Sequence, residues 1–178
     1  FLHFYKINEN PIIINDIIYD EVYFEVQNIV LKNHNPSNMD IVLISNKNKK
    51  ILFLEAKFAE YLSIVKSYTT SKEYKKIYDE LKITDEYEII EKNDKIMLVP
   101  KNHKKHYIGG IKQIISHYIG VKNFIKNKKS IDDKIILKDD FEVILGTIIF
   151  DGWKNEKYLK NYSEEYKKLV YHLKNDKN

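Results

Sequence analysis

The sequence contains no cysteine, and it has only 5 glycines and 3 prolines among its 178 residues. Without cysteine, disulfide bonds and thiolate metal sites are excluded, which fits a cytoplasmic protein. No apolar run is long enough to span a membrane and no signal peptide is visible, so we expect no membrane partner. The sequence also shows no glycine-rich nucleotide loop, no internal repeat and no elbow motif of a serine hydrolase.

Arginine is absent too, because every one of the 30 basic residues is a lysine. A lysine ammonium suits phosphate contact but lacks the planar fork with which arginine reads guanine. If this chain binds DNA, we expect lysine contacts to the DNA backbone, with base recognition left to Asn, Gln, Lys and Tyr. An AT-rich genome would produce the same bias against arginine. The net charge is only +4, so a nucleic-acid surface must be local.

The length and the 43% of hydrophobic residues allow a substantial core, so we expect residues 1–178 to form a single domain. The chain begins at Phe1 rather than Met. We therefore expect that residues precede it, or that it is a piece of a longer polypeptide.

Residues 35–58 contain two short apolar runs joined by a turn of Lys and Asn, which predicts a β-hairpin. If residues 46–49 form the turn, Ser45 faces Lys50, and counting outward places Asp40 opposite Glu55. Cross-strand partners lie about 5 Å apart at Cβ. Glu55 and Lys57 share one face of the strand, roughly 7 Å apart, because side chains alternate. The hairpin therefore gathers two carboxylates and an ammonium.

Two carboxylates held together on an apolar sheet repel each other and lose hydration, a cost that a divalent cation would relieve. Oxygen ligands suit a hard ion such as Mg²⁺, which also binds phosphate. Lys57 could then orient or deprotonate an attacking water, or balance charge on the phosphate. This combination of residues favours phosphodiester hydrolysis.

Asp40, followed on the next strand by the triplet 55–57 and preceded by Pro36, resembles the motif of the PD-(D/E)xK nuclease superfamily, which has the restriction-endonuclease-like fold. The resemblance implies that Asp40, Glu55 and the Ala56 carbonyl bind Mg²⁺, for which Mn²⁺ could substitute. It also implies that Lys57 is catalytic. Pro36 and Asp40 are not adjacent here, and this spacing varies in the family.

An acidic residue two positions before a lysine also occurs at Glu73, Glu80, Asp132 and Glu165. The triplet alone is therefore uninformative, and what distinguishes Glu55 is its place at the end of an apolar strand with an acid across the hairpin. The alternative is an edge hairpin that carries a surface Glu-Lys pair.

Before the hairpin, we expect residues 12–14 to form a short edge strand and residues 16–31 to form a helix with apolar positions at helical spacing. The resemblance implies that this helix adds an acid to the metal site, with Glu25 as the candidate and Glu21 second. The alternatives are a boundary glutamate that reaches solvent, or a strand over residues 27–32, as the three-stranded meander of the family would require.

After the hairpin, residues 59–67 are expected to form a helical turn. A capping box at residues 70–73 then opens a helix, and residues 86–90 and 95–99 form a second hairpin. We interpret about 68–100 as an insertion into the nuclease-like core, able to contact substrate or a partner.

The basic loop at residues 101–106 is expected either to touch phosphate or simply to be solvated. A helix follows, from Gly109 to about Lys126, whose apolar stripe packs on the sheet. Gln113 and His117 lie together away from the centre of that stripe. The resemblance implies a catalytic role for Gln113 beside Lys57. For His117, a surface or hydrogen-bonding role is favoured over metal ligation.

The end of this helix is basic and could contact DNA, although such runs are usually only solvated; its lysines are Lys122, Lys126, Lys128 and Lys129. Residues 141–150 are apolar on both faces and predict a central strand. A last helix over residues 155–173 carries a stripe of Tyr and Leu, expected to be core or, alternatively, a homodimer contact.

Together these patterns predict an α/β domain with a mixed central β-sheet flanked by helices, a restriction-endonuclease-like core with an inserted helix and hairpin. The expected activity is that of a Mg²⁺-dependent endonuclease that cuts DNA, with restriction or defence implied by the resemblance. The alternative is a nuclease-like module that binds nucleic acid or protein without cutting.

Overall fold

The computed structural model describes residues 4–6, 11–32, 34–58, 67–101, 110–150 and 156–174, which form a mixed α/β structure. The chain divides into two compact units. One contains residues 1–57 and 115–149, and the other contains residues 58–114 and 150–178. Within the described ranges, no helix has both the length and the apolar character needed to cross a membrane.

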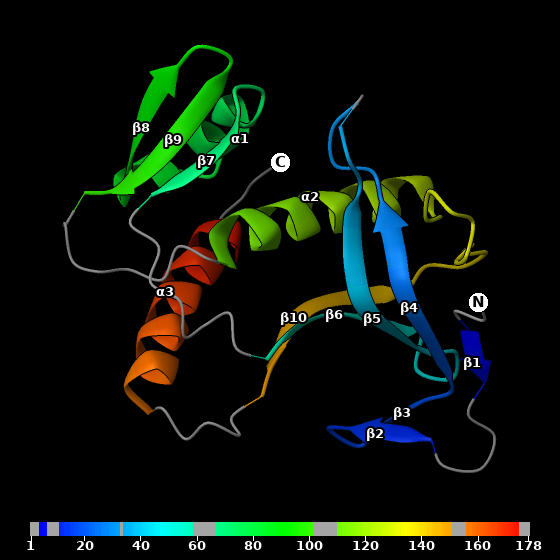
Figure 1. Cartoon of the computed structure of the whole chain (residues 1–178). Coiled ribbons are helices and arrows are strands. Elements are labelled where there is room, and N and C mark those ends of the chain that lie inside the picture. The colour runs from blue at the N-terminus through cyan, green and yellow to red at the C-terminus, as the bar shows by residue number, and fades with distance from the viewer. Residues whose placement is uncertain are drawn as a thin grey trace. The chain divides into compact units, whose positions relative to one another are not determined.

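The first unit is built on a mixed sheet with the strand order β1-β4-β5-β6-β10 (Figure 1). Strands β4, β5 and β6 form an antiparallel meander, and β10 joins β6 in parallel orientation. The bounds of the strands are β1 Phe4–Lys6, β4 Glu21–Asn28, β5 Ser37–Ser45, β6 Lys50–Lys57 and β10 Glu142–Ile149.

The β5–β6 hairpin has the register that the sequence predicts. Residues 46–49 form the turn, and Ser45 pairs with Lys50. The ladder then continues to the pair Ile41 and Leu54, which places Asp40 and Glu55 one step beyond the last pair. The predicted hairpin is confirmed.

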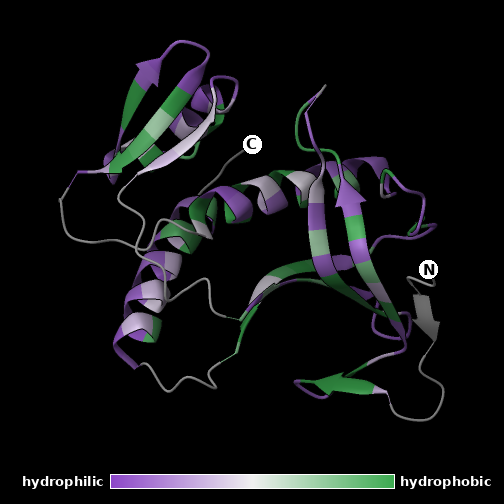
Figure 2. Ribbon diagram, in the orientation of Figure 1, coloured by the Kyte–Doolittle hydropathy of each residue, from purple (hydrophilic) through white to green (hydrophobic). Residues whose placement is uncertain are grey.

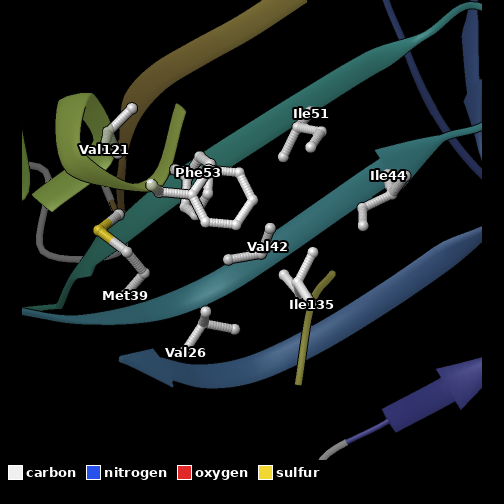
Figure 3. Close-up of a cluster of buried hydrophobic side chains, with 9 residues drawn as sticks. Val26, Met39, Val42, Ile44, Ile51, Phe53, Val121 and Ile135 are labelled. Atoms are coloured by element: carbon white, nitrogen blue, oxygen red, sulfur yellow. The ribbon is translucent and has the colours of Figure 1, made fainter. Parts of the chain in front are cut away.

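Helix α2 (Ile111–Asn127) covers one face of this sheet through residues in its second half. Figure 3 shows Val26, Val42 and Phe53, from three neighbouring strands, pointing toward the same side, with Val121 of α2 beside Phe53. Phe124 of α2 meets the Phe53 ring edge-on, with 5.1 Å between the ring centroids. This apolar contact fixes the helix on the sheet.

The opposite face of the sheet carries a small β-hairpin instead of a helix. Strands β2 (Ile12–Ile14) and β3 (Ile17–Tyr19) pair antiparallel, and β2 is hydrophobic along its length (Figure 2). Ile12, Ile14 and Ile17 pack on a cluster that includes Tyr19, Val22 and Leu43. Among the described residues of the first unit, the expectation of helices on both faces is therefore met on one face only.

The predicted helix over residues 16–31 is wrong, because this segment forms β3 and β4. Apolar residues four apart, such as Ile18, Val22 and Val26, also share a face of a regular strand, so the spacing does not separate the two structures. The segment is rich in β-branched and aromatic residues, which fit a pleated surface. Pairing with β5 decides the outcome.

Strand β4 is irregular at Glu25, whose φ of 52° lies in the left-handed region. Tyr23 and Val26 both contact the cluster under α2 although they are three residues apart, so the alternation of side chains breaks between them. The Lys134 ammonium donates to the main-chain carbonyls of Phe24 and Glu25, at 3.0 and 2.6 Å. These contacts hold the irregularity in place.

Residues 141–150 form a strand as predicted, but not a central one. β10 lies at the end of the described strand order, paired with β6. Its side chains are mostly half-buried, with Val143 and Leu145 packing on one face and Ile144 on the other. The apolar residues of β10 thus face packed side chains on both faces of the sheet. They do not indicate that β10 lies between two strands in the described strand order.

The second unit contains a small antiparallel sheet, order β7-β9-β8, and the helices α1 and α3. The predicted second hairpin is confirmed, as is the last helix. The capping box is wrong, because Thr70 and Ser71 end a strand and α1 begins later, without a side-chain cap. The expected turn at 59–67 and the basic loop fall mainly outside the described residues. The elements are β7 Tyr68–Ser71, α1 Tyr74–Glu80, η2 Ile83–Asp85, β8 Tyr87–Lys92, β9 Lys95–Pro100 and α3 Glu156–Lys174.

Within this unit, β8 and α3 are joined by a buried polar contact. The Tyr87 hydroxyl donates to Glu165 Oε1 at 2.5 Å, and Glu165 Oε2 is buried without a partner among the described residues. Burial raises the pKa of Glu165 to about 7, against the opposing effects of the Tyr87 hydrogen bond and the Lys168 charge.

We expect Glu165→Gln to remove a pH dependence of stability. Because the folded pKa of about 7 lies above the ordinary value of 4.5, the folded chain keeps a proton that the unfolded chain loses. The contribution is present below pH 4.5 and is lost as the pH rises through 7, by about 3 kcal/mol at most. Urea unfolding at several pH values measures it. Glu164→Gln, at an exposed neighbouring position, should leave the dependence unchanged.

We also expect Gly120→Ala to destabilise the first unit. Alanine normally stabilises a helix interior relative to glycine by about 1 kcal/mol. Here a Cβ on Gly120 would lie 3.1 Å from Asn28 Cβ and 3.2 Å from Ser37 Cβ, so α2 would have to move away from the sheet. Overpacking of this kind costs about 1–3 kcal/mol. A fall in the free energy of unfolding is expected in urea, and a rise of about 1 kcal/mol would contradict the close contact.

Candidate active site

The candidate site lies where the β5–β6 ladder ends. Asp40 of β5 and Glu55 of β6 both lie just beyond the last pair of that ladder, Ile41 and Leu54. At this point the main-chain N–H of Ala56 donates to Asp40 Oδ2 at 2.7 Å. The Asp40 side chain therefore reaches the neighbouring strand, and the structure brings it to the residues with which the sequence groups it.

Glu55 and Lys57 form a buried ion pair on one face of β6. The Lys57 ammonium lies 2.6 Å from Glu55 Oε1, and the two residues, Lys57 and Glu55, are 3% and 4% exposed. Their shared face follows from the alternation of side chains along the strand. This position differs from the alternative of a surface Glu-Lys pair, because water does not surround the charges.

His117 of α2 approaches the other oxygen of the same carboxylate. Its Nε2 lies 2.8 Å from Glu55 Oε2, which is a close contact between a ring nitrogen and a carboxylate oxygen. His117 is 5% exposed, which corrects the expectation that it lies away from the packed stripe. The packed face of α2 in this unit instead contains His117, Val121 and Phe124.

A serine continues this contact on the far side of the imidazole. The Ser37 hydroxyl, at the start of β5, shares a short hydrogen bond with His117 Nδ1. Ser37 pairs across the strands with Asn28, whose side-chain amide is buried without a hydrogen-bond partner among the described residues. A polar row thus runs from Asn28 through Ser37 and His117 to Glu55.

The two carboxylates differ in their electrostatic surroundings. Burial raises the pKa of Asp40; the Ala56 N–H and Lys57 oppose this rise, and nearby Glu55 adds to it. Burial would also raise the pKa of Glu55, but contacts with His117 and Lys57 outweigh it, so that pKa lies below its ordinary value. The charge of Glu55 is therefore compensated by its neighbours more fully than the charge of Asp40.

The donor set fits a hard divalent cation. Asp40, Glu55 and the Ala56 carbonyl supply oxygen atoms, which Mg²⁺ prefers, and the raised pKa of Asp40 marks a charge that a cation would relieve. Among the described residues, no group of three or more His, Cys, Asp and Glu could by itself hold a metal ion. Water and substrate phosphate would have to complete the coordination, as is usual for Mg²⁺.

The two glutamates expected from the preceding helix lie on strand β4 instead. Glu21 accepts from the Tyr23 hydroxyl at 2.8 Å and from Asn46 at 2.7 Å, near the hairpin turn at the opposite end of the β5–β6 pair. Glu25 is exposed at the strand irregularity, between the pairs that flank Asp40. Metal binding by Glu25 stays a prediction.

Gln113 is exposed on the first turn of α2, in the part of the helix that belongs to the second unit. Its catalytic role stays a prediction. At the basic end of α2, Lys128 pairs with Asp140 at 2.7 Å and Lys129 pairs with Asp133 at 3.2 Å. These ion pairs reduce the positive charge that the sequence suggests there.

No sequence pattern predicts a role for Ser37 or Asn28. The expected stripe leaves His117 away from its centre, and the hydrogen-bonding role favoured for His117 is confirmed while its surface position is not. The spacing of His117, Val121 and Phe124, at i, i+4 and i+7, is the available signal for a sheet-facing histidine. Nothing comparable marks Ser37 or Asn28, because their positions follow from strand pairing and the closeness of α2.

We expect opposite stability effects from neutralising the two carboxylates. In EDTA at pH 7, Asp40→Asn should be at least as stable as the wild type, because folding raises the pKa of Asp40 and disfavours its charge. Glu55→Gln should lose about 3 kcal/mol, because the buried Lys57 ammonium loses its 2.6 Å ion pair with Glu55. Urea unfolding measures both.

The control is Glu142→Gln. Glu142 pairs with Lys50, which lies on the same strand as Glu55 and Lys57, and this ion pair is more exposed than the pair of Glu55 and Lys57. It should cost less than about 1 kcal/mol. Equal losses in Glu55→Gln and Glu142→Gln would contradict the buried pair.

The residues of this site come from the meander β4-β5-β6 and from α2, which packs on it. Comparison with protein-family models, curated proteins and solved structures finds no match to this chain.

Proposed function

We propose that this chain is a metal-dependent endonuclease of the PD-(D/E)xK type that hydrolyses DNA phosphodiester bonds. The observation that carries the proposal is the meeting of Asp40, Glu55 and Lys57 at the open end of one hairpin. A cation site of oxygen donors with an adjacent ammonium is suited to phosphate chemistry.

The buried charges support a functional origin for the site. A buried ion pair is weak evidence for stability, since apolar residues of similar size often stabilise a fold as well or better. Glu55, Lys57 and His117 are all nearly buried at one place, where two strands of the sheet and α2 meet. A fold alone would not require this group.

The arrangement of strands also supports the restriction-endonuclease-like interpretation. The family resemblance requires a three-stranded meander that carries the acid and the Glu-x-Lys triplet on successive strands. Here β4, β5 and β6 form such a meander, with Asp40 on β5 and Glu55 on β6. Strand β4, which replaces the expected helix, supplies the first strand of this arrangement.

The proposed roles follow from the contacts. Asp40, Glu55 and the Ala56 carbonyl would hold Mg²⁺ or Mn²⁺, which when bound would supply Lewis-acid stabilisation of the charge that develops on the phosphate. Lys57, held by Glu55 at 2.6 Å, would orient the attacking water or stabilise that same charge. Water then forms the new phosphorus–oxygen bond as the bond to the leaving oxygen breaks.

The substrate and its setting are also part of the proposal. Lysines would contact the DNA backbone, because the chain has no arginine. A cytoplasmic role in restriction or defence fits the absence of cysteine and the family resemblance. The second candidate is a nuclease-like module that binds without cutting, and the intact group Asp40, Glu55 and Lys57 argues against it.

We expect DNA cleavage that requires Mg²⁺ or Mn²⁺ and disappears in EDTA. Lys57→Ala and Asp40→Ala should each lower the cleavage rate by at least about 100-fold, because each removes a group that acts on the reacting phosphate. Plasmid and oligonucleotide substrates measure the rate. The control is Lys50→Ala, on the same strand but in a more exposed ion pair with Glu142, which should retain activity.

Two results would overturn this proposal. Binding of DNA without cleavage under either metal would favour the non-cutting module. Cleavage that survives in both Asp40→Ala and Lys57→Ala would place the activity elsewhere or in a contaminant.

A further inference from the structure

We infer that His117 and Ser37 act as positioning residues for Glu55, setting the direction of its carboxylate toward the cation site. This inference rests on the proposed function, because it concerns the same metal-binding carboxylate. It adds to that function a contribution from α2, which the sequence motif does not contain.

The Glu55 carboxylate is held from two sides. His117 Nε2 faces Oε2 at 2.8 Å, while the Lys57 ammonium lies 2.6 Å from Oε1. Two cationic or polar groups on opposite oxygens leave the carboxylate little freedom to rotate. Residues that contact a metal ligand without touching the metal orient that ligand, and their substitution typically lowers metal affinity 10- to 100-fold.

Ser37 fixes the imidazole from behind. Its hydroxyl shares a hydrogen bond with Nδ1, and both residues are 5% exposed. Gly120, one turn along α2 from His117, lets the helix approach Ser37 so closely that a Cβ there would lie 3.2 Å from the Ser37 Cβ. The imidazole, which α2 carries, is therefore held in one orientation by its contacts with β5 and β6.

Two other roles fit these contacts less well. A serine nucleophile must be reached by its substrate, and Ser37 is buried under Gly120. Direct metal ligation by His117 would bring a third ligating side chain to the two carboxylates, and no such group of three exists among the described residues. An indirect role through Glu55 agrees with both facts.

The test measures Mn²⁺ binding to the full chain without DNA, from the electron paramagnetic resonance signal of free Mn²⁺. His117→Leu should raise the dissociation constant about 10- to 100-fold. Ser37→Ala should raise it about 10-fold, since the imidazole stays but loses its support. His117→Gln, whose amide can place a polar N–H group near Glu55, should bind better than His117→Leu.

The matched control is Ser45→Ala, at the other end of β5. Ser45 is fully buried and its hydroxyl accepts from the Asn48 side chain at 3.0 Å, so the substitution also removes a buried hydroxyl. It should leave the dissociation constant for Mn²⁺ within twofold of wild type. Thermal unfolding in EDTA identifies any variant that fails to fold, and His117→Gln then takes the place of His117→Leu.

The outcomes separate this inference from the proposed function. If the wild type binds Mn²⁺ and cuts DNA while the folded His117 and Ser37 variants bind within twofold of it, only the positioning role fails. It also fails if Ser45→Ala weakens binding as much as Ser37→Ala. If the wild type neither binds Mn²⁺ nor cuts DNA, the proposed function fails and the inference fails with it.

Discussion

The carboxylate of Glu55 imposes the strongest constraint on the first unit. A charge that is 4% exposed must be paired, because leaving it isolated costs several kcal/mol. One partner, Lys57, comes from the same strand, and the other, His117, comes from a helix that follows much later in the chain. The position of α2 on the sheet is therefore tied to the electrostatics of the site as well as to the apolar contacts of Phe124.

The part of the site that the sequence predicts is the part made by local pairing. A hairpin with a four-residue turn has one natural register, and the pattern of apolar residues on each side agrees with it, so Ser45 and Lys50 could be paired by counting. Asp40 and Glu55 then follow at the end of the ladder. Their nearness needed no information from distant parts of the chain.

The errors occur where distant contacts decide between patterns that look alike. Valines at 22 and 26 suit a helix or a strand equally well, and pairing with β5 selects the strand. The break at Glu25, held by Lys134, then turns Val22 and Val26 to opposite faces, which no periodic pattern would predict. A distant contact also decides the position of His117, because α2 leaves the apolar Ile125 49% exposed and buries His117, Val121 and Phe124 instead.

The two carboxylates divide the proposed work between them. Glu55 is already compensated by Lys57 and His117, so its charge is retained without a metal and its direction is set in advance. Among the described residues, the Ala56 N–H and a weaker effect of Lys57 favour the ionised form of Asp40, while burial and the charge of Glu55 oppose it, so its charge is the one that a cation would relieve. A site with both groups strongly compensated would have little affinity for Mg²⁺, and a site with neither would destabilise the sheet. Under the proposed function, this asymmetry would allow the hairpin to fold without a metal and to bind one at Asp40.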